Sequence, residues 1–172
     1  MIGRYDEVTA RWGNPDKPVT LSEGATAFLT ERVGAPKPTQ AVPRIGIVGP
    51  PTGLDDQARA RLIEVVGPEG VSLDEDTRLS HGGGFSYLDL VERRGTSPHV
   101  PDAVVFPASH DAVQQLIAAC GQLNLAIVPF GGGTSVVGGV RPERGPHAGV
   151  IAVSFENMAD VIGIADIDMT VT

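Results

Sequence analysis

Short apolar runs and one helical stripe alternate along the second half of the chain. Residues 103–106 (Ala-Val-Val-Phe) form a continuous apolar run, which is typical of a strand in a sheet covered on both faces. A helix with a good N-cap, Ser109, follows this run. Its apolar stripe consists of Val113, Leu116, Ile117, Cys120 and Leu123. Residues 126–128 and 150–154 are further apolar runs, and the order strand, helix, strand predicts a βαβ unit with parallel strands.

Helices separated by glycine and proline are predicted for the first half of the chain. They cover residues 23–33, 56–66 and 86–94, with Ser22, Asp55 and Ser86 as N-caps, Asp89 as the partner of Ser86 in a capping box, and Gly34 and Gly67 as stop signals. Residues 35–54 contain five of the fourteen prolines and predict a surface connection. Residues 71–73 are too few to assign.

The change of pattern near residues 96–101 predicts a boundary. We expect an α/β (α+β) fold, with a mainly helical region over residues 1–97 and alternating strand and helix over residues 98–172. Residues 161–165 and 169–172 predict a hairpin that turns at residues 166–168.

Composition narrows the function classes. The 172-residue chain has a formal net charge of −8, which makes nucleic acid a poor partner. No apolar run approaches the length of a membrane span, although this leaves room for peripheral membrane contact. A single cysteine, Cys120, cannot form an internal disulfide, which fits a cytoplasmic location. Its place on the apolar stripe predicts a core residue and not a reactive thiol.

The segment from Pro129 to Val136 carries the strongest chemical signal. It contains the glycine loop, by which we mean residues 131–135 (Gly-Gly-Gly-Thr-Ser) directly after a predicted strand. Glycine lets another molecule approach the backbone closely, and successive N–H groups in such a turn can hold an anion. The two hydroxyls are donors of the kind that phosphate oxygens accept. The residues therefore predict a pyrophosphate-binding loop, against the plainer alternative of a flexible turn between strands.

Two familiar phosphate-binding motifs do not fit the glycine loop. The P-loop pattern requires Lys and then Ser or Thr after its last glycine, but Gly139 and Val140 follow Gly138. The dinucleotide fingerprint requires a third glycine where Val136 stands, and no helical period follows. We therefore expect a loop that binds through its own backbone, without a helix N-terminus.

At this point the chain resembles a known family. Residues 129–135 (Pro-Phe-Gly-Gly-Gly-Thr-Ser) resemble the pyrophosphate loop of the vanillyl-alcohol-oxidase-type (PCMH-type) FAD-binding domain. Residues 101–107 resemble its first strand, and residues 109–124 its first helix. The resemblance covers about residues 98–172 and implies that the chain ends inside that domain, as an N-terminal fragment carrying its first βαβ half.

The resemblance also assigns roles. It implies FAD as cofactor, with backbone donors from Gly131, Gly132 and Gly133, and hydroxyl or backbone donors from Thr134 and Ser135. Pro129 would fix the exit from the strand, while Phe130 and Val136 would pack the flanks of the loop. Some relatives attach flavin through a histidine in this loop. Thr134 occupies that place here, so FAD is expected to bind non-covalently. The resemblance implies no catalytic residue and no metal in this chain.

A narrower resemblance points to the bacterial alkyldihydroxyacetonephosphate synthases. Residues 4–5, 11–15 and 86–95 are similar to theirs, as is the loop version Phe-Gly-Gly-Gly-Thr-Ser-Val-Val. It implies a parent enzyme of ether-lipid synthesis, which exchanges the acyl chain of acyl-dihydroxyacetone phosphate for a fatty alcohol, and we expect it to be a homo-oligomer. FAD-linked D-lactate and other 2-hydroxyacid dehydrogenases share the loop and remain an alternative, as does a non-catalytic fragment. We expect this chain alone to be inactive.

His81 and the triplet Gly82–Gly84 form a second candidate segment. They could make a second phosphate loop or a metal site, but His81 has no ligand partners at suitable spacing. We therefore expect a surface or capping histidine and a hinge that leads into the helix beginning near Ser86.

Overall fold

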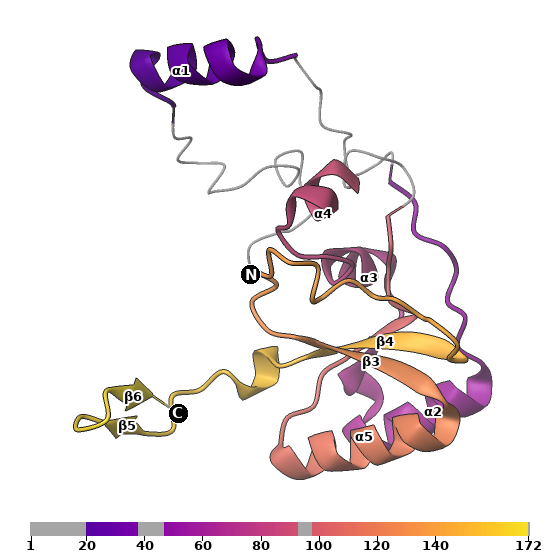
Figure 1. Ribbon diagram of the computed structural model, residues 1–172. Helices are drawn as coiled ribbons and strands as arrows, with labels where there is room; N and C mark the ends of the chain where they lie inside the picture. The colour runs from indigo at the N-terminus through magenta and orange to yellow at the C-terminus, as the bar shows by residue number, and fades with distance from the viewer. Residues whose placement is uncertain (1–19, 38–46, 93–97, 172) are drawn as a thin grey trace.

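A four-stranded sheet forms the centre of the computed structural model, which describes residues 20–37, 47–92 and 98–171. The strand order is β1 (Val71–Ser72), β2 (Ala103–Val105), β4 (Gly149–Ser154) and β3 (Leu125–Phe130). Strands β2, β4 and β3 run parallel, and β1 pairs antiparallel with β2. The predicted mixed α/β class is confirmed (Figure 1).

Strand β4 lies between β2 and β3. The expectation that β2 and β3 run parallel is confirmed, but the two strands are not neighbours in the sheet. Every residue of β4 is buried, as suits a central strand, whereas β3 contains the exposed Pro129. Proline has no N–H to donate to a ladder and is tolerated at a sheet edge. The helix between β2 and β3 therefore crosses over the position that β4 fills.

Two helices, α2 (Asp56–Val66) and α5 (His110–Leu123), cover one face of the sheet (Figure 1). The N-caps predicted for them are confirmed, because the amide of Ala58 donates to Asp55 Oδ1 at 2.7 Å and that of Ala112 to Ser109 Oγ at 3.1 Å. The main core joins the two helices to the sheet through Ala58, Leu62, Ala103, Val105, Leu116, Cys120, Leu125, Ile151 and Val153.

Helices α3 (Glu75–Ser80) and α4 (Tyr87–Glu92) lie on the opposite side of the sheet (Figure 1). Leu79 of α3 packs with Ile47 and Val100 in a second, smaller core. The guanidinium of the buried Arg78 donates to the carbonyl oxygens of Pro101 and Pro50, both at 2.8 Å. Burial lowers the pKa of Arg78.

Asp102 joins the start of β2 to two other segments. Its Oδ1 accepts a hydrogen bond from the amide of Gly53 at 2.7 Å, and its Oδ2 accepts one from the amide of Val150 at 2.8 Å. The segment before α2 is thereby tied to the beginning of the central strand.

Two elements stand apart from this body. Helix α1 (Glu23–Val33) is capped by Ser22 as predicted, and none of its residues is buried. A hairpin of β5 (Ile164–Ala165) and β6 (Thr170–Val171) projects beyond the 3-10 turn at Glu156–Met158 (Figure 1). The predicted hairpin is confirmed, and both of its strands are exposed.

Several sequence predictions need correction or extension. Ile117 does not belong to the buried stripe, because it is 57% exposed and α5 turns Leu116, Ala119 and Cys120 inward instead. Strand β1 and helix α3 were not predicted, nor was the short 3-10 turn at Pro68–Gly70. Helix α4 begins after Ser86 as expected, but the predicted end at residues 93–95 lies outside the described residues, as do residues 4–15.

The boundary near residue 97 stays a prediction. Strand β1 and helix α2 precede it, yet they share the sheet and the main core with the strands that follow it.

Candidate functional site

The glycine loop leaves the carboxyl end of β3. The strands β2 and β4 run in the same direction, so their carboxyl ends lie at the same side of the sheet. Ligands of open parallel sheets bind at this side. As the sequence predicts, the described residues 131–148 contain turns and bends and no helix.

The three glycines of the loop differ in what the protein requires of them. Gly131 and Gly132 are exposed; a Cβ on Gly131 would meet nothing within 4 Å, and one on Gly132 only the methyl group of Thr134 at 3.7 Å. Gly133 is buried and has φ +66°, a conformation that other residues adopt at a cost. Gly133 therefore shapes the turn, whereas Gly131 leaves open space beside the backbone.

Backbone amides of the loop remain available to a ligand. Among the described residues, no carbonyl accepts a hydrogen bond from the amide of Gly131, Gly133 or Thr134. Thr134 is also exposed. The loop thus offers backbone N–H donors, and no side chain at Gly131 blocks the approach to them. Such a set of N–H groups can bind phosphate oxygens.

The residues on either side of the loop differ in burial. Phe130 is only 1% exposed, and its ring centroid lies 4.4 Å from that of His81. Its carbonyl accepts a hydrogen bond from the amide of Phe155 at 3.1 Å, which continues the ladder past the end of β4. Pro129 is exposed at the end of the edge strand. Val136 is 64% exposed, so the structure does not show the packing role predicted for it.

Ser135 closes the loop. Its Oγ accepts a hydrogen bond from the amide of Gly139 at 3.0 Å, and its carbonyl oxygen accepts one from the amide of Phe85 at 2.6 Å. The second bond joins two segments that lie fifty residues apart in the sequence.

Residues 82–85, which we call the glycine strap, contact the glycine loop through Gly84 and Phe85. Gly82, Gly83 and Gly84 are all buried. The sequence predicts a hinge for this triplet, with a second phosphate loop or a metal site as the alternatives. It does not reveal the contact of the triplet with the glycine loop. Its only sequence signal is the repeated glycine, which indicates close backbone approach without identifying the partner.

Asp89 of α4 holds the strap in place. Its carboxylate is buried, and Oδ2 accepts hydrogen bonds from the amides of Gly84 and Ser86 at 3.3 and 3.2 Å and from Ser86 Oγ at 2.7 Å. Ser86 Oγ in turn accepts from the amide of Asp89 at 3.1 Å. The capping box predicted from Ser86 and Asp89 is confirmed, and it also binds the strap.

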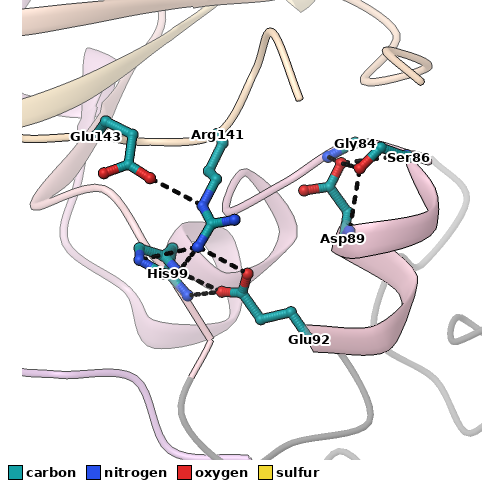
Figure 2. A network of polar contacts seen from close by, with 7 residues as sticks. All are labelled: Gly84, Ser86, Asp89, Glu92, His99, Arg141 and Glu143. Carbon is teal, nitrogen blue, oxygen red and sulfur yellow. Dashed lines mark hydrogen bonds and ion pairs between the residues drawn. The ribbon is translucent and has the colours of Figure 1, made fainter. Parts of the chain in front are cut away.

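An ionic network flanks the same region (Figure 2). Arg141 lies 3.2 Å from Glu92 Oε2, and its buried Nε makes an ionic contact at 2.9 Å with Glu143 without hydrogen-bond geometry. The same guanidinium contacts both ring nitrogens of His99, and His99 Nδ1 contacts Glu92. Arg141 is therefore already paired with carboxylates, and the donors that the loop offers are its own amides.

Comparison with known proteins identifies the class to which this site belongs. Residues 101–172 match the family model described as "FAD binding domain", which begins just before β2 and includes the whole glycine loop. This part of the chain is similar to the FAD-binding domain family, and the match supports FAD as the cofactor.

Relatives narrow the class. An alkyldihydroxyacetonephosphate synthase from Trypanosoma brucei brucei is 38% identical over 95 residues, which is 55% of this chain and 16% of the relative. A solved structure titled as an alkyldihydroxyacetonephosphate synthase superposes with a TM-score of 0.70 at 25% identity, covering 84% of this chain and 28% of that one.

Another relative is named for the alternative function, that of a D-lactate dehydrogenase. A Danio rerio protein named "Probable D-lactate dehydrogenase, mitochondrial" is 36% identical over 111 residues, or 63% of this chain and 19% of the relative. The chain thus spans less than a third of the length of each of these three proteins. The relatives are named as enzymes, and in the described part of the chain no helix is long and apolar enough to cross a membrane.

Proposed function

We propose that this chain supplies the pyrophosphate-binding part of the FAD site in a flavoenzyme of the alkyldihydroxyacetonephosphate synthase type. The observation that carries the proposal is the glycine loop itself, whose exposed backbone at Gly131 has open space beside it. The amides of Gly131, Gly133 and Thr134 donate to no carbonyl of the described residues and suit the oxygens of a diphosphate.

Each predicted residue has a place in this proposal. The Gly131, Gly132 and Gly133 backbone and the Thr134 hydroxyl would face the diphosphate, because three of these four residues are exposed and Gly133 sets the turn. Ser135 and Phe130 would support the loop without facing the diphosphate. Ser135 closes the loop, and Phe130 anchors its start in the core. Val136 would lie at the rim.

Bound FAD would supply an isoalloxazine ring as the reactive group, while the protein supplies binding and orientation. For the whole enzyme we infer exchange of the acyl group of acyl-dihydroxyacetone phosphate for a fatty alcohol, which is what the resemblance to the alkyldihydroxyacetonephosphate synthases implies. We assign no catalytic residue to this chain, and we expect the chain alone to lack this activity. A homo-oligomeric, cytoplasmic parent enzyme with peripheral membrane contact stays a prediction.

Thr134 bears on how the flavin is held. A threonine hydroxyl does not form the histidyl bond to flavin that some related proteins use, so we infer non-covalent FAD. Denaturation with trichloroacetic acid should release all flavin into the supernatant. Flavin that stays in the protein pellet would contradict this inference.

A second candidate function is an FAD-linked 2-hydroxyacid dehydrogenase, favoured by the 36% identity to the D-lactate dehydrogenase relative. The two candidates share the loop and differ in whether the substrate reduces the flavin. Anaerobic addition of D-lactate or glycolate to the whole flavoenzyme should leave its visible flavin bands unchanged on the main proposal. Bleaching of these bands would favour the dehydrogenase.

The FAD site can be tested with two matched glycine substitutions. A Cβ on Gly131 and a Cβ on Gly121 of α5 both meet nothing within 4 Å, so Gly131→Ala and Gly121→Ala should both fold normally. Only the first places a methyl group where the diphosphate would approach. We expect it to weaken FAD binding about ten-fold, since losing a hydrogen bond to a charged oxygen costs about 1.5 kcal/mol.

Fluorescence titration of FAD into the two variants and the wild type measures this effect. Equal dissociation constants for Gly131→Ala and wild type would exclude the loop as the binding element. A wild-type chain that stays colourless after FAD addition would support the third alternative, a fragment without bound flavin.

A further inference from the structure

The contact between the two glycine segments is of an unusual kind, because backbone lies directly on backbone. The amide of Phe85 donates to the carbonyl oxygen of Ser135 at 2.6 Å. A Cβ on Gly84 would lie 2.3 Å from the same oxygen and 3.1 Å from Cγ2 of Val140. Residues with side chains essentially never approach another atom so closely, so only glycine at position 84 allows this contact.

The strap also contacts residues outside the glycine loop. A Cβ on Gly82 would lie 2.2 Å from the carbonyl oxygen of His99, and Gly83 packs against the side chain of Asp89. Oδ2 of Asp89 accepts a hydrogen bond from the amide of Gly84 (Figure 2). The strap is therefore also packed against His99 and Asp89, neither of which belongs to the glycine loop.

A second contact connects the same two segments. His81, directly before the strap, lies against Phe130, directly before the glycine loop, with ring centroids 4.4 Å apart. Nδ1 of His81 contacts the carbonyl oxygen of Thr77 in α3 at 2.8 Å, which keeps the ring in this position. The glycine loop is thus supported at its start through Phe130 and at its end through Ser135.

We propose that the glycine strap positions the glycine loop for FAD, with Gly84 and Asp89 as positioning residues. The proposal rests on the proposed function of the loop. Displacement of the strap moves the carbonyl of Ser135, and with it the amides that lie between Ser135 and the fixed end at Phe130. An anion held by several backbone amides requires all of them to point at it together. A small displacement of the loop should therefore weaken FAD binding more than it lowers the stability of the fold.

The test compares two substitutions in the same strap. Gly84→Ala creates a clash with the carbonyl oxygen of Ser135 in the glycine loop, whereas Gly82→Ala creates a clash of similar size with the carbonyl oxygen of His99, which is not part of the loop. Both should destabilise the protein, as urea unfolding will show. We expect Gly84→Ala to weaken FAD binding about ten-fold more than Gly82→Ala and to change the visible circular dichroism of bound FAD.

A second pair covers the case in which Gly84→Ala does not fold. Asp89→Ala removes the acceptor of the Gly84 and Ser86 amides, whereas Asp89→Asn keeps an oxygen acceptor in the same place. We expect several-fold weaker FAD binding for Asp89→Ala and recovery of most of the affinity in Asp89→Asn. Wild-type affinity in both Gly84→Ala and Asp89→Ala would overturn the inference while leaving the FAD site intact.

Hydrogen exchange separates this inference from the proposed function. If the wild type binds no FAD, the proposed function fails, and exchange at the amides of residues 132–135 still tests the support. Faster exchange there in Gly84→Ala than in Gly82→Ala supports positioning of the loop by the strap. Equal exchange in the two variants overturns it.

Discussion

Single glycines of the loop serve different purposes, although they are neighbours in the sequence. Gly133 adopts a backbone conformation that the turn requires, with φ +66°. Gly131 has no such conformation, and a Cβ added to it would have no neighbour within 4 Å, so the fold itself does not require a glycine there. On the proposed function, the missing side chain at Gly131 would instead leave room for the ligand.

This difference predicts opposite outcomes for two alanine substitutions. Gly133→Ala should lower the free energy of unfolding by about 1–2 kcal/mol, the usual cost of a left-handed L-residue. Gly131→Ala should leave the free energy of unfolding unchanged or raise it by about 0.5 kcal/mol, because alanine reduces the conformational entropy of the unfolded chain. Urea denaturation of both variants checks this prediction. A destabilised Gly131→Ala would mean that the protein itself requires this glycine.

Cys120 shows how burial changes the chemistry of one side chain. The thiol is 1% exposed in the core under the sheet, and burial raises its pKa from 9.0 to about 11. The unfolded state therefore loses this proton at lower pH than the folded state. The stabilisation is complete below pH 9 and declines as the pH rises towards 11, by at most about 1.4 kcal/mol per pH unit.

Unfolding experiments at pH 8, 9, 10 and 11 on wild type and Cys120→Ala measure this effect. The difference in stability between the two proteins should shrink towards pH 11. A constant difference would show that the folded thiol titrates like an unfolded one. At pH 8 the folded protein should also react with thiol reagents far more slowly than the denatured chain.

At the scale of elements, the N-caps determine where the helices begin. The Ser109 and Ser22 side chains accept hydrogen bonds from amides of the first turn in the same way, at 3.1 and 3.2 Å. The two helices differ in how they pack against the rest of the protein. Helix α5 contributes to the main core, whereas α1 buries no residue.

Removal of the two caps should therefore have different consequences. Ser109→Ala should lower the global free energy of unfolding by about 1 kcal/mol. Ser22→Ala should reduce only the helical content of α1, because this helix makes no buried contact that global unfolding would break. Urea unfolding followed by circular dichroism at 222 nm reports both quantities. Equal shifts in the unfolding midpoint would show that α1 is coupled to the core.

The elements that could be predicted from sequence are those with local signals. Ser22, Asp55, Ser86 and Ser109 mark helix starts, and the glycine loop follows a strand as expected. Strand β1 has only two residues and obtains its hydrogen bonds from β2, so nothing local distinguishes it. The position of β4 between β2 and β3 and the contact of Gly84 with Ser135 depend on segments far apart in the chain, which periodicity cannot reveal.

At the scale of the whole molecule, the helical first half and the FAD-binding second half share one core. Leu62 of α2 is fully buried among residues of α5 and the sheet. Strand β1 and the glycine strap likewise belong to the first half and contact the second. The glycine loop therefore contacts residues that precede the matched family domain.

Leu62→Ala tests this shared core. The substitution should lower the free energy of unfolding by about 2–5 kcal/mol, because it opens a cavity beneath the sheet. Leu29→Ala in α1, where the side chain is 42% exposed, is the matched control and should change it by less than about 0.5 kcal/mol. Equal effects would mean that α2 does not contribute to the stability of the sheet.

The FAD site is tested most directly by titrating the ¹⁵N-labelled chain with FAD and following the amide chemical shifts in NMR spectra. We expect saturable shifts that are largest at residues 131–135 and smaller at Phe85 in the strap, and that weaken in Gly131→Ala. An absence of shifts, or shifts concentrated away from the glycine loop, would contradict this expectation.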